Sequence, residues 1–144
     1  MPSGARKSII WRNLSPIARA ALCAEPVAPM RIGIVANEPS GDQLAAGVIR
    51  ALREARPDIS FIGVAGPRMA EAGCETLIDQ ERLAVMGLVE VLRHLPEVLR
   101  LRRQLGDYFL ANRPDLFIGV DAPDFNLTLE RRLRRAGIPT AHLV

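Results

Sequence analysis

From residue 31 onward, short apolar runs alternate with longer segments whose apolar residues repeat with a helical period. Strands that alternate with helices form parallel sheets with right-handed crossovers, because each crossover must return the chain to the same end of the sheet. We therefore expect an α/β protein with a parallel sheet and helices on both of its faces. We predict strands over about 31–36, 59–65, 74–78, 116–120 and 140–144, and helices over about 42–55, 68–72, 88–112 and 125–136.

Glycine and proline mark several of the predicted helix boundaries. Gly73 and Gly137 each follow a helical segment, where a glycine can adopt the left-handed conformation that ends a helix. Pro96 lies within the third helical segment, and we expect it to interrupt that helix or to mark a restart.

Residues 1–29 do not share the alternating pattern. They contain four prolines and show no clean period, so we interpret them as an extension that is disordered or is translated from a start upstream of Met30. A targeting peptide is the alternative, although the segment lacks the continuous apolar stretch of a secretory signal. Residues 30–144 are expected to form one domain. We expect it to be incomplete, since the last predicted strand has no closing helix.

Composition argues against several classes of protein. The formal net charge of +3 arises within the first 30 residues, where four basic residues face one acidic residue, and the remainder is balanced. Aromatic residues make up only 4% of the sequence, so few side chains could stack on nucleic-acid bases, and we expect no nucleic-acid partner. Cys23 and Cys74 are isolated, and we predict neither a metal site nor a cofactor. No apolar stretch reaches the roughly 18 residues of a membrane-spanning helix.

Two polar clusters follow predicted strands at the end of the sheet where ligands bind in open α/β proteins. The first comprises Asp121, Asp124 and Asn126, directly after the apolar run 116–120. An aspartate in such a place can act as a general base toward a sugar hydroxyl, and Asp121 has no evident structural role that competes with this one. Asp124 has a second interpretation as the N-cap of the following helix.

The second cluster is the turn 38–42, which contains Glu38, Ser40, Gly41 and Asp42. It fits a sugar- or phosphate-binding turn, since the N-terminus of a helix attracts anions. It equally fits an ordinary strand-to-helix loop in which Ser40 or Asp42 caps the helix. Neither a Walker loop nor a GxGxxG fingerprint is present.

Two further segments have two interpretations each. Arg68 follows a strand and two glycines, where it could contact a phosphate or could be an ordinary solvated residue. The amphipathic stretch 83–105 fits a helix at a membrane surface or a crossover helix packed on the sheet. His94 and His142 have no partner at a ligand spacing, and we predict neither as a ligand.

Four motifs together resemble the lipid-A-disaccharide synthase family. The segments 38–42, 63–69, 83–91 and 119–126 occur in the order and spacing of that family, and the resemblance extends from residue 31 to residue 144. The resemblance implies the N-terminal half of a GT-B glycosyltransferase, in which two Rossmann-like domains face each other across a cleft. Asn37 departs from the family's pattern, which usually has a glycine at that position.

The implied reaction joins UDP-diacylglucosamine to diacylglucosamine 1-phosphate, with inversion, and gives lipid A disaccharide 1-phosphate and UDP. The implied partners are this UDP-sugar donor, this lipid acceptor and the cytoplasmic face of the bacterial inner membrane. The resemblance implies a second domain, which carries most of the UDP-sugar contacts in this fold, and we expect that domain to lie outside the sequence. We therefore expect the chain alone to be inactive. A non-catalytic Rossmann-like module that binds a nucleotide or a partner is the alternative.

The resemblance also assigns roles to residues. Asp121 matches the general base that activates the acceptor hydroxyl, and the turn 38–42 matches a polar turn on the acceptor side of the cleft. Arg68, Asp124 and Asn126 complete the expected substrate-binding set. The apolar positions expected to contact the membrane or acyl chains are Val89, Val91, Leu92, Leu95, Val98 and Leu99.

Overall fold

A computed structural model describes residues 15–23, 29–83 and 91–144, and in these ranges the chain forms a five-stranded sheet between two layers of helices. The strands lie in the order β3-β2-β1-β4-β5, and every neighbouring pair is parallel. The predicted α/β class and parallel sheet are confirmed. The strands are β1 (Arg31–Ala36), β2 (Ser60–Ala65), β3 (Cys74–Asp79), β4 (Leu116–Val120) and β5 (Thr140–Leu143).

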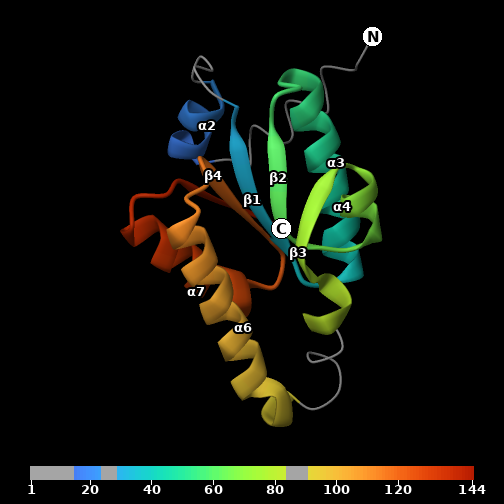
Figure 1. The fold of residues 1–144 in the computed structure, drawn as a ribbon, viewed down its shortest axis with the longest axis vertical. Coiled ribbons are helices and arrows are strands. Elements are labelled where there is room, and N and C mark those ends of the chain that lie inside the picture. Colours follow the sequence, from blue (N-terminus) through green and yellow to red (C-terminus); the bar gives the residue numbers. More distant parts are fainter. Residues whose placement is uncertain (1–14, 24–28, 84–90) are drawn as a thin grey trace.

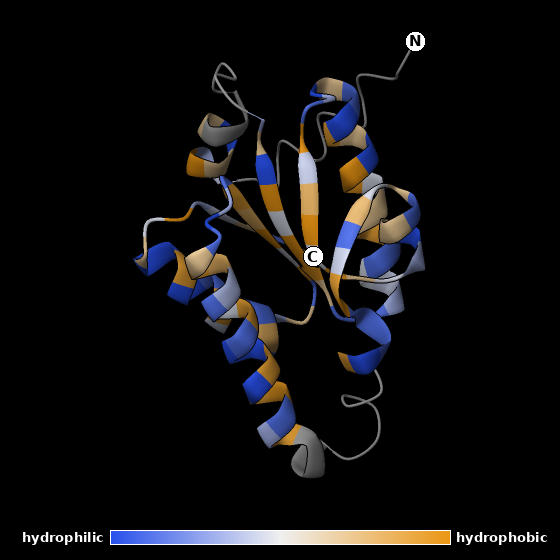
Figure 2. Ribbon diagram, viewed as in Figure 1, coloured by the Kyte–Doolittle hydropathy of each residue, from blue (hydrophilic) through white to orange (hydrophobic). Residues whose placement is uncertain are grey.

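Helices cover both faces of the sheet, as Figure 1 shows. One face packs against α3 and α4, and the other packs against α6 and α7. Figure 2 shows that the strands between these layers are predominantly apolar, whereas the helices carry hydrophilic residues on their outer sides. The helices are α2 (Pro16–Cys23), α3 (Pro39–Ala55), α4 (Pro67–Glu71), α6 (Val91–Ala111) and α7 (Pro123–Arg135).

Alternating residues of β1 supply the two cores. Ile32 and Ile34 belong to the core under α3, and Val35 belongs to the core under α6 and α7. Gly33 leaves space for an aromatic ring, because a Cβ at this position would lie 2.7 Å from Cε1 of Phe109. Phe109 also packs edge-to-face on Phe117, with ring centroids 5.3 Å apart. The small residue in β1 thus allows α6 to approach the sheet closely.

Several predicted boundaries need correction. Helix α3 begins at Pro39, three residues before the predicted start, because proline is well suited to the first turn of a helix. Helix α6 runs through Pro96 without interruption, so the predicted break is wrong. Gly73 and Gly137 have φ values of +105° and +88°, and the predicted glycine-terminated helices are confirmed.

The extension contains a helix that the sequence pattern did not predict. The Ser15 Oγ accepts a hydrogen bond from the N–H of Ala18 at 3.1 Å and thereby caps α2. The same hydroxyl donates to the carbonyl of Thr140 in β5 at 3.3 Å. Ala18 is fully buried in the core under α3. This part of the extension therefore packs on the sheet.

Candidate active site at the carboxyl edge of the sheet

The two predicted polar clusters lie next to each other at the carboxyl edge of the sheet. Ala36, the last residue of β1, pairs with Val120, the last residue of β4, so the two strands end side by side. The helix after β1 lies on one face of the sheet, and the helix after β4 lies on the other. Ligands bind in the crevice at such a topological switch point. The turn 38–42 and Asp121 lie just beyond these two strand ends.

Asp121 occupies a strained turn. Asp121 and Ala122 have φ values of 50° and 41°, and they are the non-glycine residues with positive φ in the described ranges. Such conformations cost on the order of 1–3 kcal/mol each and persist only where the surroundings enforce them. The half-buried Asp121 donates its N–H to the carbonyl of Leu143 at 2.8 Å. This bond fixes the turn to β5.

Asn126 holds the same turn from the other side. Its Nδ2 donates to the carbonyls of Val120 at 3.1 Å and Asp121 at 2.9 Å, and the residue is fully buried. Within the described residues its Oδ1 has no hydrogen-bond partner. Both N–H groups of the amide are thus used within the chain, and Asn126 shapes the turn that presents Asp121.

Asp124 does not cap the following helix. Helix α7 starts at Pro123, its N-cap is Ala122, and no side chain caps it. Asp124 lies in the first turn with its side chain exposed, where a carboxylate interacts favourably with the helix dipole. The interpretation of Asp124 as an N-cap is therefore wrong, and its side chain is exposed to solvent.

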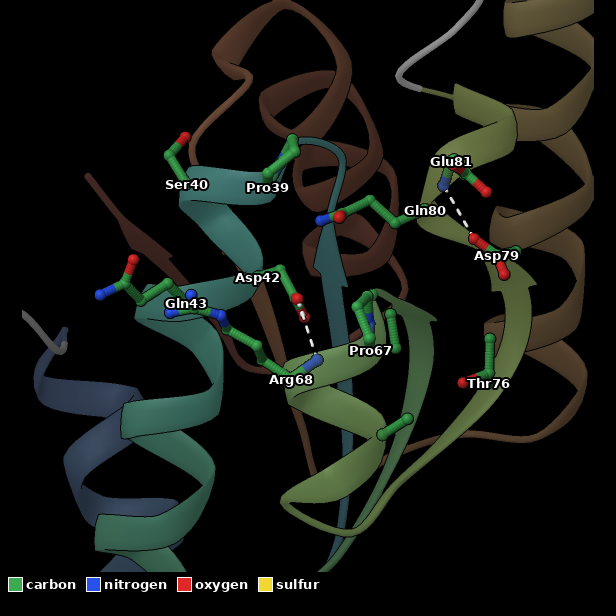
Figure 3. A pocket seen from close by; sticks show the side chains of 13 residues that line it. Pro39, Ser40, Asp42, Gln43, Pro67, Arg68, Thr76, Asp79, Gln80 and Glu81 are labelled. Carbon is green, nitrogen blue, oxygen red and sulfur yellow. Dashed lines mark hydrogen bonds between the residues drawn. The ribbon is translucent and has the colours of Figure 1, made fainter.

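Asp42 caps a helix, but not the predicted one. Its carboxylate accepts from the N–H of Arg68 at 3.0 Å (Figure 3) and from the N–H of Met69 at 2.9 Å, both in the first turn of α4. The residue is 2% exposed. Helix α3 itself begins after Glu38 without a side-chain cap, so the prediction that Ser40 or Asp42 caps α3 is wrong. Asp42 instead joins the turns that follow β1 and β2.

Gln80 completes this junction, and sequence reasoning did not identify it. Its Nε2 donates to the carbonyls of Ala36 at 3.1 Å and Glu38 at 2.6 Å, and the residue is 4% exposed. A single glutamine after a strand carries no pattern that distinguishes it from a solvated polar residue. Asn37, beside it in the turn, is buried and is not in the positive-φ set, so this position does not require glycine for its backbone conformation.

A cavity of about 650 Å³ lies beside this junction, and we refer to it as the polar cavity because eight of its lining residues have polar or charged side chains. Ser40 and Arg68, both predicted as binding residues, line it with exposed side chains, whereas the predicted Gly41 is buried against Ala36 and Val120. Among the described residues, no three His, Cys, Asp or Glu side chains are grouped to hold a metal ion. The remaining lining residues are Pro39, Asp42, Gln43, Ala65, Gly66, Pro67, Ala70, Thr76, Asp79, Gln80 and Glu81.

A buried glutamate and a partly buried histidine form a pair beside Gly119, two residues before Asp121. Glu130 of α7 is 1% exposed, and its Oε1 lies 2.7 Å from Nδ1 of His142 in β5. Burial raises the pKa of Glu130, and the hydrogen bond from His142 opposes this shift. His142, which seemed isolated in the sequence, therefore has a specific partner from another element.

The amphipathic stretch is partly exposed. Leu95 and Leu99 of α6 are 43% and 42% exposed, and Val98 is half-buried against the core. Val89 and the side chains of Val91 and Leu92 lie outside the described residues. No helix within the described ranges has the length and apolarity needed to cross a membrane.

Comparisons with known proteins agree on one family. The sequence profile of the family described as lipid-A-disaccharide synthetase matches residues 32–144. The lipid-A-disaccharide synthase of Methylobacillus flagellatus is 60% identical over 113 residues, which cover 78% of this chain and 30% of the relative. That of Vibrio cholerae is 56% identical over 116 residues, which cover 81% and 31%. The chain thus spans about 30% of the length of the curated relatives that it matches.

Proposed function

The chain belongs to the lipid-A-disaccharide synthase family, and from this premise we propose that it forms the acceptor-side part of a glycosyltransferase of lipid A biosynthesis. The observation that carries the proposal is the position of Asp121. It stands in an enforced left-handed turn at the switch point of the sheet, next to the polar turn 38–42. A strained backbone that presents one carboxylate is typical of a functional site.

In the proposed reaction Asp121 is the general base. Its carboxylate takes the proton of an acceptor hydroxyl while the oxygen of that hydroxyl attacks the anomeric carbon of the UDP-sugar. The bond from this carbon to UDP breaks, and its electron pair leaves with UDP. The attack and the departure take place on opposite faces of the carbon in a single displacement, so the configuration inverts. We propose that groups of a second domain, outside this sequence, contact UDP. The chain supplies the acceptor site and the base.

The polar cavity next to the junction of Asp42 and Gln80 is our proposed site for the sugar headgroup of the lipid acceptor. Ser40 and Asp79 offer a hydroxyl and a carboxylate to sugar hydroxyls, and the exposed Arg68 guanidinium can pair with a phosphate. The uncapped first turn of α3 adds free backbone N–H groups at the same place. These features suit a headgroup that combines a sugar with a phosphate.

The exposed leucines of α6 are the proposed contact with the membrane. An enzyme that takes acylated sugars must meet them at a lipid surface, and Leu95 and Leu99 offer apolar area for such a contact. The proposal places the protein at the cytoplasmic face of the bacterial inner membrane as a peripheral protein.

An assay of the full-length product of the reading frame tests the proposal. The product is supplied with UDP-diacylglucosamine and diacylglucosamine 1-phosphate, and the disaccharide and UDP are quantified. We expect both products, and we expect Asp121→Asn to lower kcat by about 10²–10⁴-fold while the protein still folds. Turnover by Asp121→Asn close to the wild-type value would exclude Asp121 as the base. Absence of turnover by the wild type would favour a binding module.

A further inference from the structure

Gly119 of β4 lies beneath two polar side chains of α7. A Cβ at this glycine would collide with Oε1 of Glu130 and would lie 3.0 Å from Cβ of Asn126. Asn126 and Glu130 are one helical turn apart, so both point from α7 onto the same spot of the sheet. The missing side chain of Gly119 therefore makes room for this polar layer.

His142 attaches this layer to the neighbouring strand. It is the register partner of Gly119, and its Nδ1 lies 2.7 Å from Oε1 of Glu130. Leu143, the next residue of β5, accepts the N–H of Asp121 at 2.8 Å. The pair thus joins α7 to the part of β5 that holds the backbone of Asp121.

Both backbone polar groups of Asp121 are hydrogen-bonded by residues next to the Glu130–His142 pair. Its N–H is bound by Leu143, beside His142, and its carbonyl is bound by Asn126, one turn before Glu130. Filling this space with a buried carboxylate and an imidazole is not the most stable choice, since apolar side chains of similar volume usually stabilise a protein at least as well. The presence of this pair is better explained by an effect on the orientation of Asp121 than by a contribution to the stability of the folded protein.

We propose that Glu130 and His142 act as positioning residues that hold the Asp121 carboxylate in the direction required for its role as base. The proposal rests on the proposed function, because it concerns the same aspartate. Neither residue contacts the reacting atoms. Their effect passes through Asn126 and Leu143 to the two peptide groups of Asp121.

The experiment measures kcat and both KM values of the full-length protein, together with its melting temperature. We expect Glu130→Gln to lower kcat at least tenfold and to change each KM less than about twofold. His142→Leu should have a similar effect. His142→Asn, whose side-chain amide can take the place of Nδ1 as the hydrogen-bond partner of Glu130, should recover part of the lost kcat. A double variant Glu130→Gln/His142→Leu should be no slower than the slower single variant, because the two residues act as one unit.

Thr140→Val is the matched control. The Oγ1 of Thr140 also joins β5 to α7, because it accepts hydrogen bonds of 3.2 and 3.0 Å from Arg134, but at the end of β5 remote from Asp121. This variant keeps the charge of Arg134, which opposes the rise that burial causes in the pKa of Glu130. It should lower the melting temperature without changing kcat per folded molecule. If Glu130→Gln and His142→Leu behave like this control, the pair is merely structural and the inference is wrong. If Glu130→Gln fails to fold, the contrast between His142→Asn and His142→Leu decides.

Asp121→Asn separates the two proposals. If it is nearly inactive while Glu130→Gln and His142→Leu keep full kcat, the positioning inference fails and the role of Asp121 stands. If Asp121→Asn itself retains normal turnover, the proposed base is wrong and the positioning inference falls with it.

Discussion

The side-chain amide of Gln80 donates to the backbone carbonyl of Glu38 across 2.6 Å, and so a residue beyond β3 fixes the turn that follows β1. The same nitrogen also reaches the carbonyl of Ala36. We expect Gln80→Met, which keeps the volume but removes the donors, to lower the free energy of unfolding by about 1–3 kcal/mol, because two carbonyls lose their buried partner. Urea denaturation followed by circular dichroism measures this difference, and an unchanged midpoint would contradict it.

Asp42→Ala should destabilise the protein by about 2 kcal/mol. The substitution leaves the N–H groups of Arg68 and Met69 without the charged acceptor that they have in a nearly inaccessible place. Asp107→Ala is the control, since Asp107 forms an exposed ion pair with Arg132 whose loss should cost less than about 1 kcal/mol. If both variants lost the same free energy of unfolding, the hydrogen bonds from Asp42 to α4 would contribute no more than an exposed ion pair.

Ala122→Gly tests the strain in the Asp121 turn. Because φ of Ala122 is 41°, replacing it by glycine should remove about 1–2 kcal/mol of backbone strain from the folded state. The larger conformational entropy of glycine in the unfolded chain offsets part of this gain. We expect a net stabilisation of up to about 1 kcal/mol. Ala136→Gly, at the other end of α7 with φ of −85°, should instead destabilise by about 0.5–1 kcal/mol. Thermal unfolding of the two variants measures these changes. A loss of stability in Ala122→Gly would contradict the inference that the backbone at Ala122 is strained.

Cys74 should resist alkylation while the protein is folded. Burial raises the pKa of its thiol to about 12, so at pH 8 only about one side chain in ten thousand is the reactive thiolate. In a Cys23→Ser background, iodoacetamide at pH 8 should modify Cys74 slowly in buffer and rapidly in urea, as followed by mass spectrometry. Rapid modification of the folded protein would mean that the thiol is accessible.

Glu130 should make stability depend on pH. Because burial raises the pKa of Glu130 in the folded state above its unfolded value, the folded protein holds this proton more tightly. The associated stability is complete below the unfolded pKa and is lost as the pH rises through the folded pKa. The free energy of unfolding of the wild type, minus that of Glu130→Gln, should therefore fall from pH 4 to pH 7. Denaturation at a series of pH values measures this difference, and a rise would contradict the assignment.

The sheet could be predicted from the sequence because its signals are local. β1, β2 and β4 are short apolar runs, and glycines such as Gly73 and Gly137 mark helix ends in any context. The location of the polar clusters at one edge follows from the parallel topology alone. Helix α2 escaped prediction because its order depends on a contact between Ser15 and Thr140, which are 125 residues apart.

The roles of individual polar residues were harder to predict for the same reason. Asp42 stands where a cap of α3 would stand, and only the proximity of the neighbouring turn makes it the cap of α4. His142 finds Glu130 on a different element, and no spacing along the chain indicates that pairing. Sequence patterns therefore indicated where the polar clusters would lie, whereas tertiary contacts determine which of their side chains are bound within the chain and which are exposed.

The junction formed by Asp42 and Gln80 also bears on affinity. Since these buried side chains already fix the turns that border the polar cavity, a ligand that enters it does not have to order those turns. Binding loses much of its free energy when loops and side chains must be immobilised, and preorganisation removes that cost. On binding there, a small ligand with few contacts would lose mainly its own translational and rotational freedom. The protein would lose little conformational entropy, so that even a few contacts could give a measurable affinity.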